Sequence, residues 1–153
     1  MVAAVAVMCN AASVDWKVTA GNMYASNGTS KYTGTFNLYA TGGDLAADVL
    51  VYTLANVSNG TIANQAFSTT TLTVGESYSF YFVLDDGGKS FTSDLKTGLT
   101  AAATGATPIN FGNMQSATQN ASNWKGSSPV PEPTSGLLLL LGVAGLALKR
   151  KRA

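Results

Sequence analysis

The sequence predicts a mainly β protein, a small antiparallel β-sandwich with one short helix at most. Three observations support this fold class. Apolar and polar residues alternate with a period of two in several stretches, and glycine- and asparagine-rich turns separate those stretches. Thr, Val, Tyr and Phe, which suit a pleated surface, are frequent in them. The length of 153 residues corresponds to one modest domain, although the order of the strands cannot be read from the pattern.

Three strands are predicted most clearly, because their apolar residues fall on every second position. The inward sets are Val14, Trp16 and Val18; Phe36, Leu38 and Ala40; and Tyr78, Phe80, Phe82 and Leu84. We assign Trp16 to the core. Further strands are expected over 62–67, around Leu72 and Val74, and over 108–111. Turns are expected at Asn27-Gly28, Gly42-Gly43, Asn59-Gly60 and Asp85 to Gly88.

Three stretches give weaker signals. Residues 44–56 begin with a good N-cap, Asp44, and place Leu45, Val49 and Tyr52 at helical spacing. Because Leu50, Tyr52 and Leu54 also alternate, a strand is the competing interpretation, and we favour a short helix. Residues 98–107 read as a loop. Residues 115–130 contain few apolar side chains besides Trp124 and read as a partly ordered linker after a β-rich extracytoplasmic domain over 14–114.

The N-terminus is predicted to be the remnant of a secretory signal peptide over residues 1–13. An apolar run is followed by small residues, as at a cleavage site. The basic segment that opens such a signal is missing, so we expect the true start to lie upstream. Cys9 follows Met8, where a lipoprotein signal requires Gly or Ala. A buried N-terminal strand is the alternative.

The C-terminus has three parts in a fixed order. A Pro-Glu-Pro motif comes first, at Pro131, Glu132 and Pro133. An uncharged segment follows, predicted to be a single transmembrane helix, in which we single out Gly136, Leu137, Leu138, Leu139, Leu140, Leu141, Leu146 and Leu148. Its 16 residues from 133 to 148 span about 24 Å as a helix, short of the ~30 Å hydrocarbon core. The basic end, Lys149, Arg150, Lys151 and Arg152, should stay cytoplasmic by the positive-inside rule.

This tail resembles the PEP-CTERM sorting signal of Gram-negative bacteria over residues 131–153. The resemblance implies an exosortase as partner, a membrane-embedded processing enzyme that cuts near the Pro-Glu-Pro motif. It also implies a precursor held in the inner membrane, transiently or permanently, and then a product at the cell surface or in the exopolysaccharide matrix. The alternative is an ordinary C-terminal anchor with a proline-rich stalk.

The composition argues against an enzyme and against a cofactor. The chain has no histidine and one cysteine, which excludes most zinc sites and Ser-His-Asp or Cys-His nucleophiles. Five lysines against seven acidic residues between positions 13 and 128 give the body a net charge of −2, which offers no footprint for nucleic acid. Asp85, Asp86 and Asp94 could hold a weakly bound Ca²⁺, but a turn explains the first two better. Asp44 and Asp48 are better explained by helix capping than by a catalytic carboxyl pair.

The most direct interpretation is therefore an exported, non-enzymatic surface or matrix protein. The alternative is a carbohydrate-binding module in which exposed aromatic rings stack on sugars. The candidate glycan contacts are Tyr39, Tyr81 and Trp124, with Tyr24 and Tyr32 also not obviously inward. A purely structural role in cross-strand pairs or on the second face of a sheet would explain Tyr39 and Tyr81 equally well.

Overall fold

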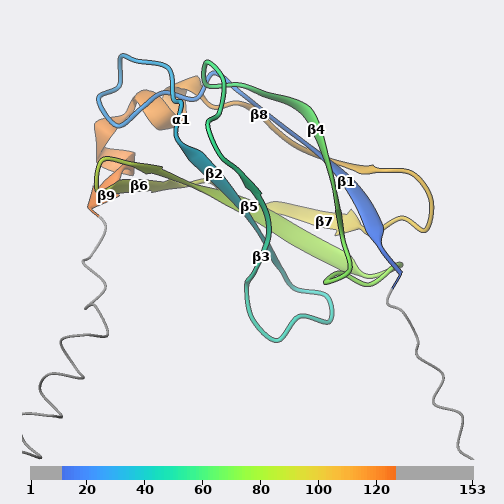
Figure 1. Cartoon of the computed structure of the whole chain (residues 1–153). Coiled ribbons are helices and arrows are strands. Elements are labelled where there is room, and N and C mark those ends of the chain that lie inside the picture. Colours follow the sequence, from blue (N-terminus) through green and yellow to red (C-terminus); the bar gives the residue numbers. More distant parts are fainter. Residues whose placement is uncertain (1–11, 127–153) are drawn as a thin grey trace, which may run out of the picture.

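The computed structural model describes residues 12–126 (Figure 1). The signal-peptide remnant up to residue 11, the Pro-Glu-Pro motif, the predicted transmembrane segment and the basic end lie outside the described residues. The strands are β1 Val14–Gly21, β2 Thr35–Thr41, β3 Val49–Leu54, β4 Ile62–Thr69, β5 Ser77–Asp86, β6 Lys89–Thr92, β7 Lys96–Thr100, β8 Thr107–Asn113 and β9 Lys125–Gly126. The helix α1 covers Gln115–Gln119, and a 3-10 turn, η1, covers Ala121–Asn123.

The strands form two sheets, which confirms the mainly β class. One sheet has the order β4-β1-β8, and the other has the order β3-β2-β5-β6-β9, with β7 also paired to β5. All pairs are antiparallel except β1 and β8, which run parallel. The prediction of a wholly antiparallel arrangement is wrong for this pair, because β8 reaches β1 by a crossover from β7 in the other sheet and not by a hairpin.

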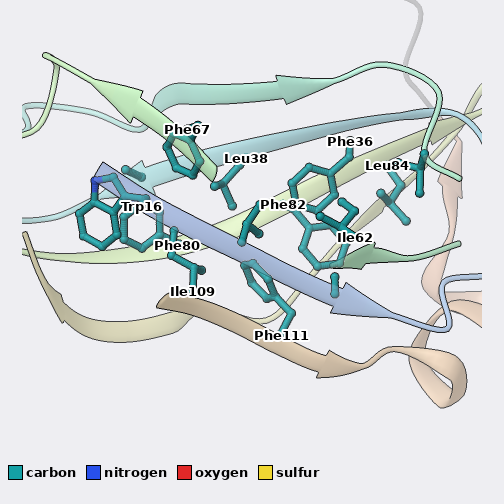
Figure 2. Close-up of a cluster of buried hydrophobic side chains, with 14 of the residues drawn as sticks. Trp16, Phe36, Leu38, Ile62, Phe67, Phe80, Phe82, Leu84, Ile109 and Phe111 are labelled. Atoms are coloured by element: carbon teal, nitrogen blue, oxygen red, sulfur yellow. The ribbon is translucent and has the colours of Figure 1, made fainter. Parts of the chain in front are cut away.

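The core lies between the two sheets, where side chains from both meet (Figure 2). The Trp16 ring on β1 packs against Phe80 on β5 with ring centroids 4.7 Å apart. Phe82 on β5 meets Phe111 on β8 edge to face at the same centroid distance. The predicted inward sets of β1, β2 and β5 are all buried, and Trp16 is fully enclosed. Period-two alternation therefore identified the core faces of these three strands correctly.

The short helix expected over residues 44–56 is absent, and that expectation is wrong. Residues 42–48 form turns and bends, and Val49–Leu54 form the strand β3, which pairs with β2. Asp44 does not cap a helix. The strand interpretation is correct, although a register shift at Val51 places Leu50 on the outer face, opposite to Tyr52 and Leu54. Tyr52 on β3 stacks on Phe67 of β4, with ring centroids 4.8 Å apart. A helix would not place this ring between the sheets.

The linker predicted from residue 115 is wrong for residues 115–126, which fold onto the domain. The helix α1, the 3-10 turn and β9 occupy this stretch, and Trp124 is only 5% exposed. The Trp124 ring lies 5.8 Å from the Phe91 ring and 6.2 Å from the Tyr32 ring, measured between centroids. One large apolar side chain with two aromatic neighbours therefore holds an otherwise polar segment in place.

The predicted loop over residues 98–107 is shorter than expected, since β7 extends to Thr100 and β8 begins at Thr107. The turn predicted at Asp85 to Gly88 is confirmed. It joins β5 to β6, and Asp86 is paired with Lys89 across it. Gly87 and Gly88 both adopt positive φ values, at 56° and 82°, which a tight hairpin turn requires.

Candidate functional site

The outer face of the six-stranded sheet carries the two tyrosines predicted as glycan contacts. Tyr39 on β2 and Tyr81 on β5 are direct cross-strand partners, and both are half-buried. Their rings stack with centroids 5.2 Å apart and planes inclined by 9°. Each ring therefore covers one face of the other.

Polar groups surround this tyrosine pair. The Tyr81 hydroxyl donates to Asp48 Oδ2 at 2.8 Å, and the Thr53 hydroxyl donates to Asn37 Oδ1 at 3.0 Å. Leu50, which is 48% exposed, is the β3 partner of Tyr39. Stacking rings beside amide, hydroxyl and carboxylate groups are the chemical elements of sugar recognition, but the pair is also an ordinary cross-strand contact.

The tyrosine hydroxyls and the aspartates shift one another's pKa values. Desolvation, with a smaller effect of the bond to Asp48, raises the pKa of Tyr81 to about 12. Hydrogen bonds from Thr41 and Tyr81 lower the pKa of Asp48 below its ordinary value. At neutral pH the tyrosine is therefore a protonated donor and the aspartate an ionised acceptor. A carboxyl group that acts as a general acid must be protonated, and the Asp48 carboxylate of this pair is ionised at neutral pH.

Asp44, four positions before Asp48 in the sequence, makes a similar contact with Tyr78. Its carboxylate accepts a bond from the Thr73 hydroxyl at 2.6 Å and another from the Tyr78 hydroxyl at 2.5 Å. These two bonds lower the pKa of Asp44, the first more than the second. Asp44 and Asp48 thus tie the connection between β2 and β3 to neighbouring elements. This structural role was missed in the sequence because neither tyrosine partner is close in the chain.

Trp124 is not available as a glycan contact, and that prediction is wrong. Its ring is buried, and its indole N–H donates to the Thr118 carbonyl oxygen at 2.8 Å. Tyr32 is buried as well, at 1% exposure. Tyr24 is half-buried. The Lys31 ammonium lies 4.1 Å from the centre of its ring, so a cation already covers one face of that ring.

The three acids considered for calcium do not come together. Asp86 Oδ2 instead accepts a bond from the Ser26 backbone N–H at 2.7 Å. Within residues 12–126, no group of three or more His, Cys, Asp or Glu side chains is arranged to hold a metal ion. Asp94 lies in a different place, on a pocket of about 230 Å³.

That pocket lies where the C-terminal segment meets β6, and the sequence offered no sign of it. Its lining residues are Phe91, Thr92, Asp94, Met114, Ala117, Asn123 and Lys125. Asp94 is its one carboxylate and Lys125 its one ammonium group. A hydrolase of the two-carboxylate type could not be built from these residues alone.

No helix of the described part is long and apolar enough to cross a membrane. The described domain ends at Gly126, five positions before Pro131 in the sequence. The sorting residues therefore follow directly on a folded domain.

Comparison with known proteins yields one finding. Neither the curated proteins nor the solved structures contain a match to this chain. A family model described as the PEP-CTERM protein-sorting motif matches residues 129–152, which include the Pro-Glu-Pro residues, the uncharged leucine-rich segment and the basic end. The chain therefore carries a PEP-CTERM protein-sorting motif, which implies that it is an exported sorting substrate processed by an exosortase.

Proposed function

We propose that this chain is a non-enzymatic protein of the cell surface or exopolysaccharide matrix, delivered there by its C-terminal motif. The observation that carries the proposal is the family match over residues 129–152, directly after a folded β domain. On this proposal, the uncharged segment holds the precursor in the inner membrane while Lys149 to Arg152 keep its end in the cytoplasm.

The chemistry of the Pro-Glu-Pro motif suits recognition by a processing enzyme. Proline fixes its own φ angle and restricts the residue before it to extended conformations. Glu132, flanked by Pro131 and Pro133, therefore presents its carboxylate on a stiff, extended backbone. An extended backbone with one fixed charge fits a groove that binds the substrate before cleavage.

The described domain supports a structural role rather than catalysis. Two of its carboxylates, Asp44 and Asp48, accept tyrosine hydroxyl bonds that tie a connection to the sheets. Charged residues make up 11% of the chain against a typical ~25%. A domain with few charges and a tightly packed core suits a protein that persists outside the cell.

The proposal is tested by measuring the intact mass and the C-terminal peptide of the protein from each cell fraction. We expect a surface or medium form that ends near Pro131 to Pro133, and a membrane form that retains Lys149 to Arg152. Glu132→Ala should cause the longer membrane form to accumulate. The matched control is Glu76→Ala. Glu76 is the only other glutamate of the sequence, and it is exposed on the folded domain. Unchanged processing of Glu132→Ala would count against the recognition role of this residue, and a surface form that keeps the basic end would count against cleavage.

A second candidate function is glycan binding through the stacked pair Tyr39 and Tyr81. The observation that favours it is their half-exposed position beside Asp48, Asn37 and Thr53. Retention on purified exopolysaccharide should fall severalfold in Tyr39→Ala and Tyr81→Ala. It should stay unchanged in Tyr24→Ala, a half-buried tyrosine on another surface. Equal retention of all three variants would eliminate this function.

A further inference from the structure

The edge strand β3 has one side without a strand partner. Within residues 12–126, β3 pairs with β2 alone and forms the end of the six-stranded sheet (Figure 1). Its residues, Val49 to Leu54, are Val, Leu, Val, Tyr, Thr and Leu. They include no charge, proline or glycine, and the two valines, the tyrosine and the threonine favour strands. An unpaired edge of this composition is a template on which another strand can add.

The other outer strands of the described domain carry features that discourage such pairing. β9 has two residues, one of them Lys125, and β7 contains Lys96. β8 contains Pro108, and Asn64 in β4 has a φ of 47°, next to an irregularity in the register with β1. In β3 the corresponding feature is a bulge at Val51, where the register with β2 shifts between Leu38 and Tyr39. A bulge twists an edge without adding charge or removing a hydrogen-bond donor. β3 is therefore the least protected edge.

Charge also favours this side of the molecule for contact between two copies. Residues 49–75 contain no charged side chain, whereas the whole body has a net charge of −2. Two identical copies repel each other wherever like charges meet. β3 itself carries no charge, so an association along this strand avoids such repulsion. The charges next to the uncharged stretch are Asp48, which immediately precedes β3 and accepts a bond from the Tyr81 hydroxyl, and Asp15 and Asp44, which accept bonds from Ser68 and Thr73.

An apolar strip continues from this edge across the sheet. Leu50 is 48% exposed, its β2 partner is Tyr39, and Tyr39 stacks on Tyr81. The exposed surface of Leu50 lies beside the unpaired edge, so a strand added to β3 would cover part of this side chain. Burial of this apolar surface would favour the association.

We propose that two copies of this chain associate through β3, edge to edge and antiparallel, so that their six-stranded sheets become continuous. The pairing is centred on Tyr52, which lies opposite its own copy. Because Val51 is bulged, Leu50 then lies opposite Thr53 of the second copy. Asp48 and its symmetry mate lie roughly 20 Å apart at ~3.4 Å per residue, beyond the ~8–10 Å Debye length. Since the strand is short and bulged, we expect an association that dissociates on dilution.

The test measures the molar mass of the full chain, purified in detergent, by light scattering over a dilution series. The parent chain should be dimeric when concentrated and monomeric when dilute. Leu50→Lys/Thr53→Lys places lysine opposite lysine in both halves of the pairing and should weaken the dimer about tenfold or more. Leu50→Lys/Thr53→Glu places lysine opposite glutamate and should retain the dimer. Leu95→Lys, which changes an apolar side chain that is 52% exposed outside β3, is the surface control and should leave the dimer unchanged.

Three outcomes would overturn the proposal. They are a parent chain that is monomeric at every concentration, a Lys/Lys variant as dimeric as the parent, and a Lys/Glu variant as weak as the Lys/Lys variant. Should the double variants fail to fold, hydrogen exchange on the parent chain decides the question. Exchange of the β3 amides should then slow as the concentration rises while that of the β9 amides stays constant, and equal behaviour of both strands would contradict the pairing.

Discussion

The Tyr32 hydroxyl joins the connection between β1 and β2 to the start of β2 and the end of β5. It lies 2.6 Å from the Thr35 carbonyl oxygen and 2.9 Å from the Asp85 carbonyl oxygen, and it accepts a bond from the Asp85 backbone N–H at 3.1 Å. The side chain is 1% exposed. Tyr32→Phe keeps the ring but removes the oxygen, so three partly buried groups lose this partner: the Asp85 backbone N–H and the carbonyl oxygens of Thr35 and Asp85.

Each buried polar group left without a partner costs about 1–3 kcal/mol. We therefore expect Tyr32→Phe to lower the free energy of unfolding by about 2 kcal/mol, allowing for some relaxation of the carbonyl groups. At roughly 4 °C per kcal/mol for a domain of this size, Tm should fall by about 8 °C. Urea denaturation followed by tryptophan fluorescence measures the change, since Trp16 and Trp124 are both buried.

Alkaline pH gives an independent readout of the same hydroxyl. Burial raises the pKa of Tyr32 to about 12, whereas an unfolded tyrosine titrates near 10. The stabilisation linked to this proton is complete below about pH 10 and is lost as pH rises through about 12. Tyr81, whose pKa is also raised to about 12, contributes a similar loss. Tyr32→Phe should remove the part of the stability loss at alkaline pH that comes from Tyr32 and leave the part that comes from Tyr81.

The matched control is Tyr24→Phe. The Tyr24 hydroxyl makes none of the hydrogen bonds found within residues 12–126, so we expect a change of less than about 0.5 kcal/mol. A Tyr32→Phe variant within about 0.5 kcal/mol of the parent, with the same loss at alkaline pH, would refute the role assigned to this hydroxyl.

Three further predictions concern stability. Trp124→Ala should cost about 3–5 kcal/mol in the free energy of unfolding, measured in urea, and a cost below about 1 kcal/mol would mean that residues 115–126 do not pack as described. The pKa of Asp44 is lowered in the fold, so its contribution to stability is complete above the unfolded pKa near 4 and is lost as pH falls through the folded value. Asp44→Asn should therefore lose less stability than the parent when both are titrated with acid. Identical losses of stability in the two proteins would exclude the effect. Gly60→Ala should lower Tm, because φ is 62° and a Cβ would lie 2.1 Å from the Met23 carbonyl oxygen; a variant as stable as the parent would show that the turn can shift freely.

Half-buried strands could be predicted from the sequence because their pattern is local. In β5, Tyr78, Phe80, Phe82 and Leu84 face the core, and the residues between them face outward, so each position depends only on its parity. The sorting motif could be recognised for a similar reason. Its proline, leucine and basic residues are adjacent in the chain, and the family comparison confirms them.

Features that depend on distant partners could not be predicted in this way. Trp124 is surrounded by polar residues in the sequence, and its burial follows from the positions of Tyr32 and Phe91. Tyr32 has the same dependence, since its hydroxyl partners include Asp85. For residues 44–56 the helical and strand patterns were both present. Pairing with β2 and the contact of Tyr52 with Phe67 favour the strand over the helix, and local spacing does not reveal either contact.

The parallel pair β1 and β8 affects when the domain can fold during export. β1 is the first strand of the domain and β8 is the last long one, so the pairing of β1 with β8, unlike its pairing with β4, waits until almost the whole domain has emerged. Contacts of such large sequence separation slow folding, which favours an unfolded chain during passage through a narrow channel. Folding is completed only when Trp124 arrives, a few residues before the Pro-Glu-Pro motif. The order of emergence thus couples the completion of the fold to the arrival of the sorting motif at the membrane.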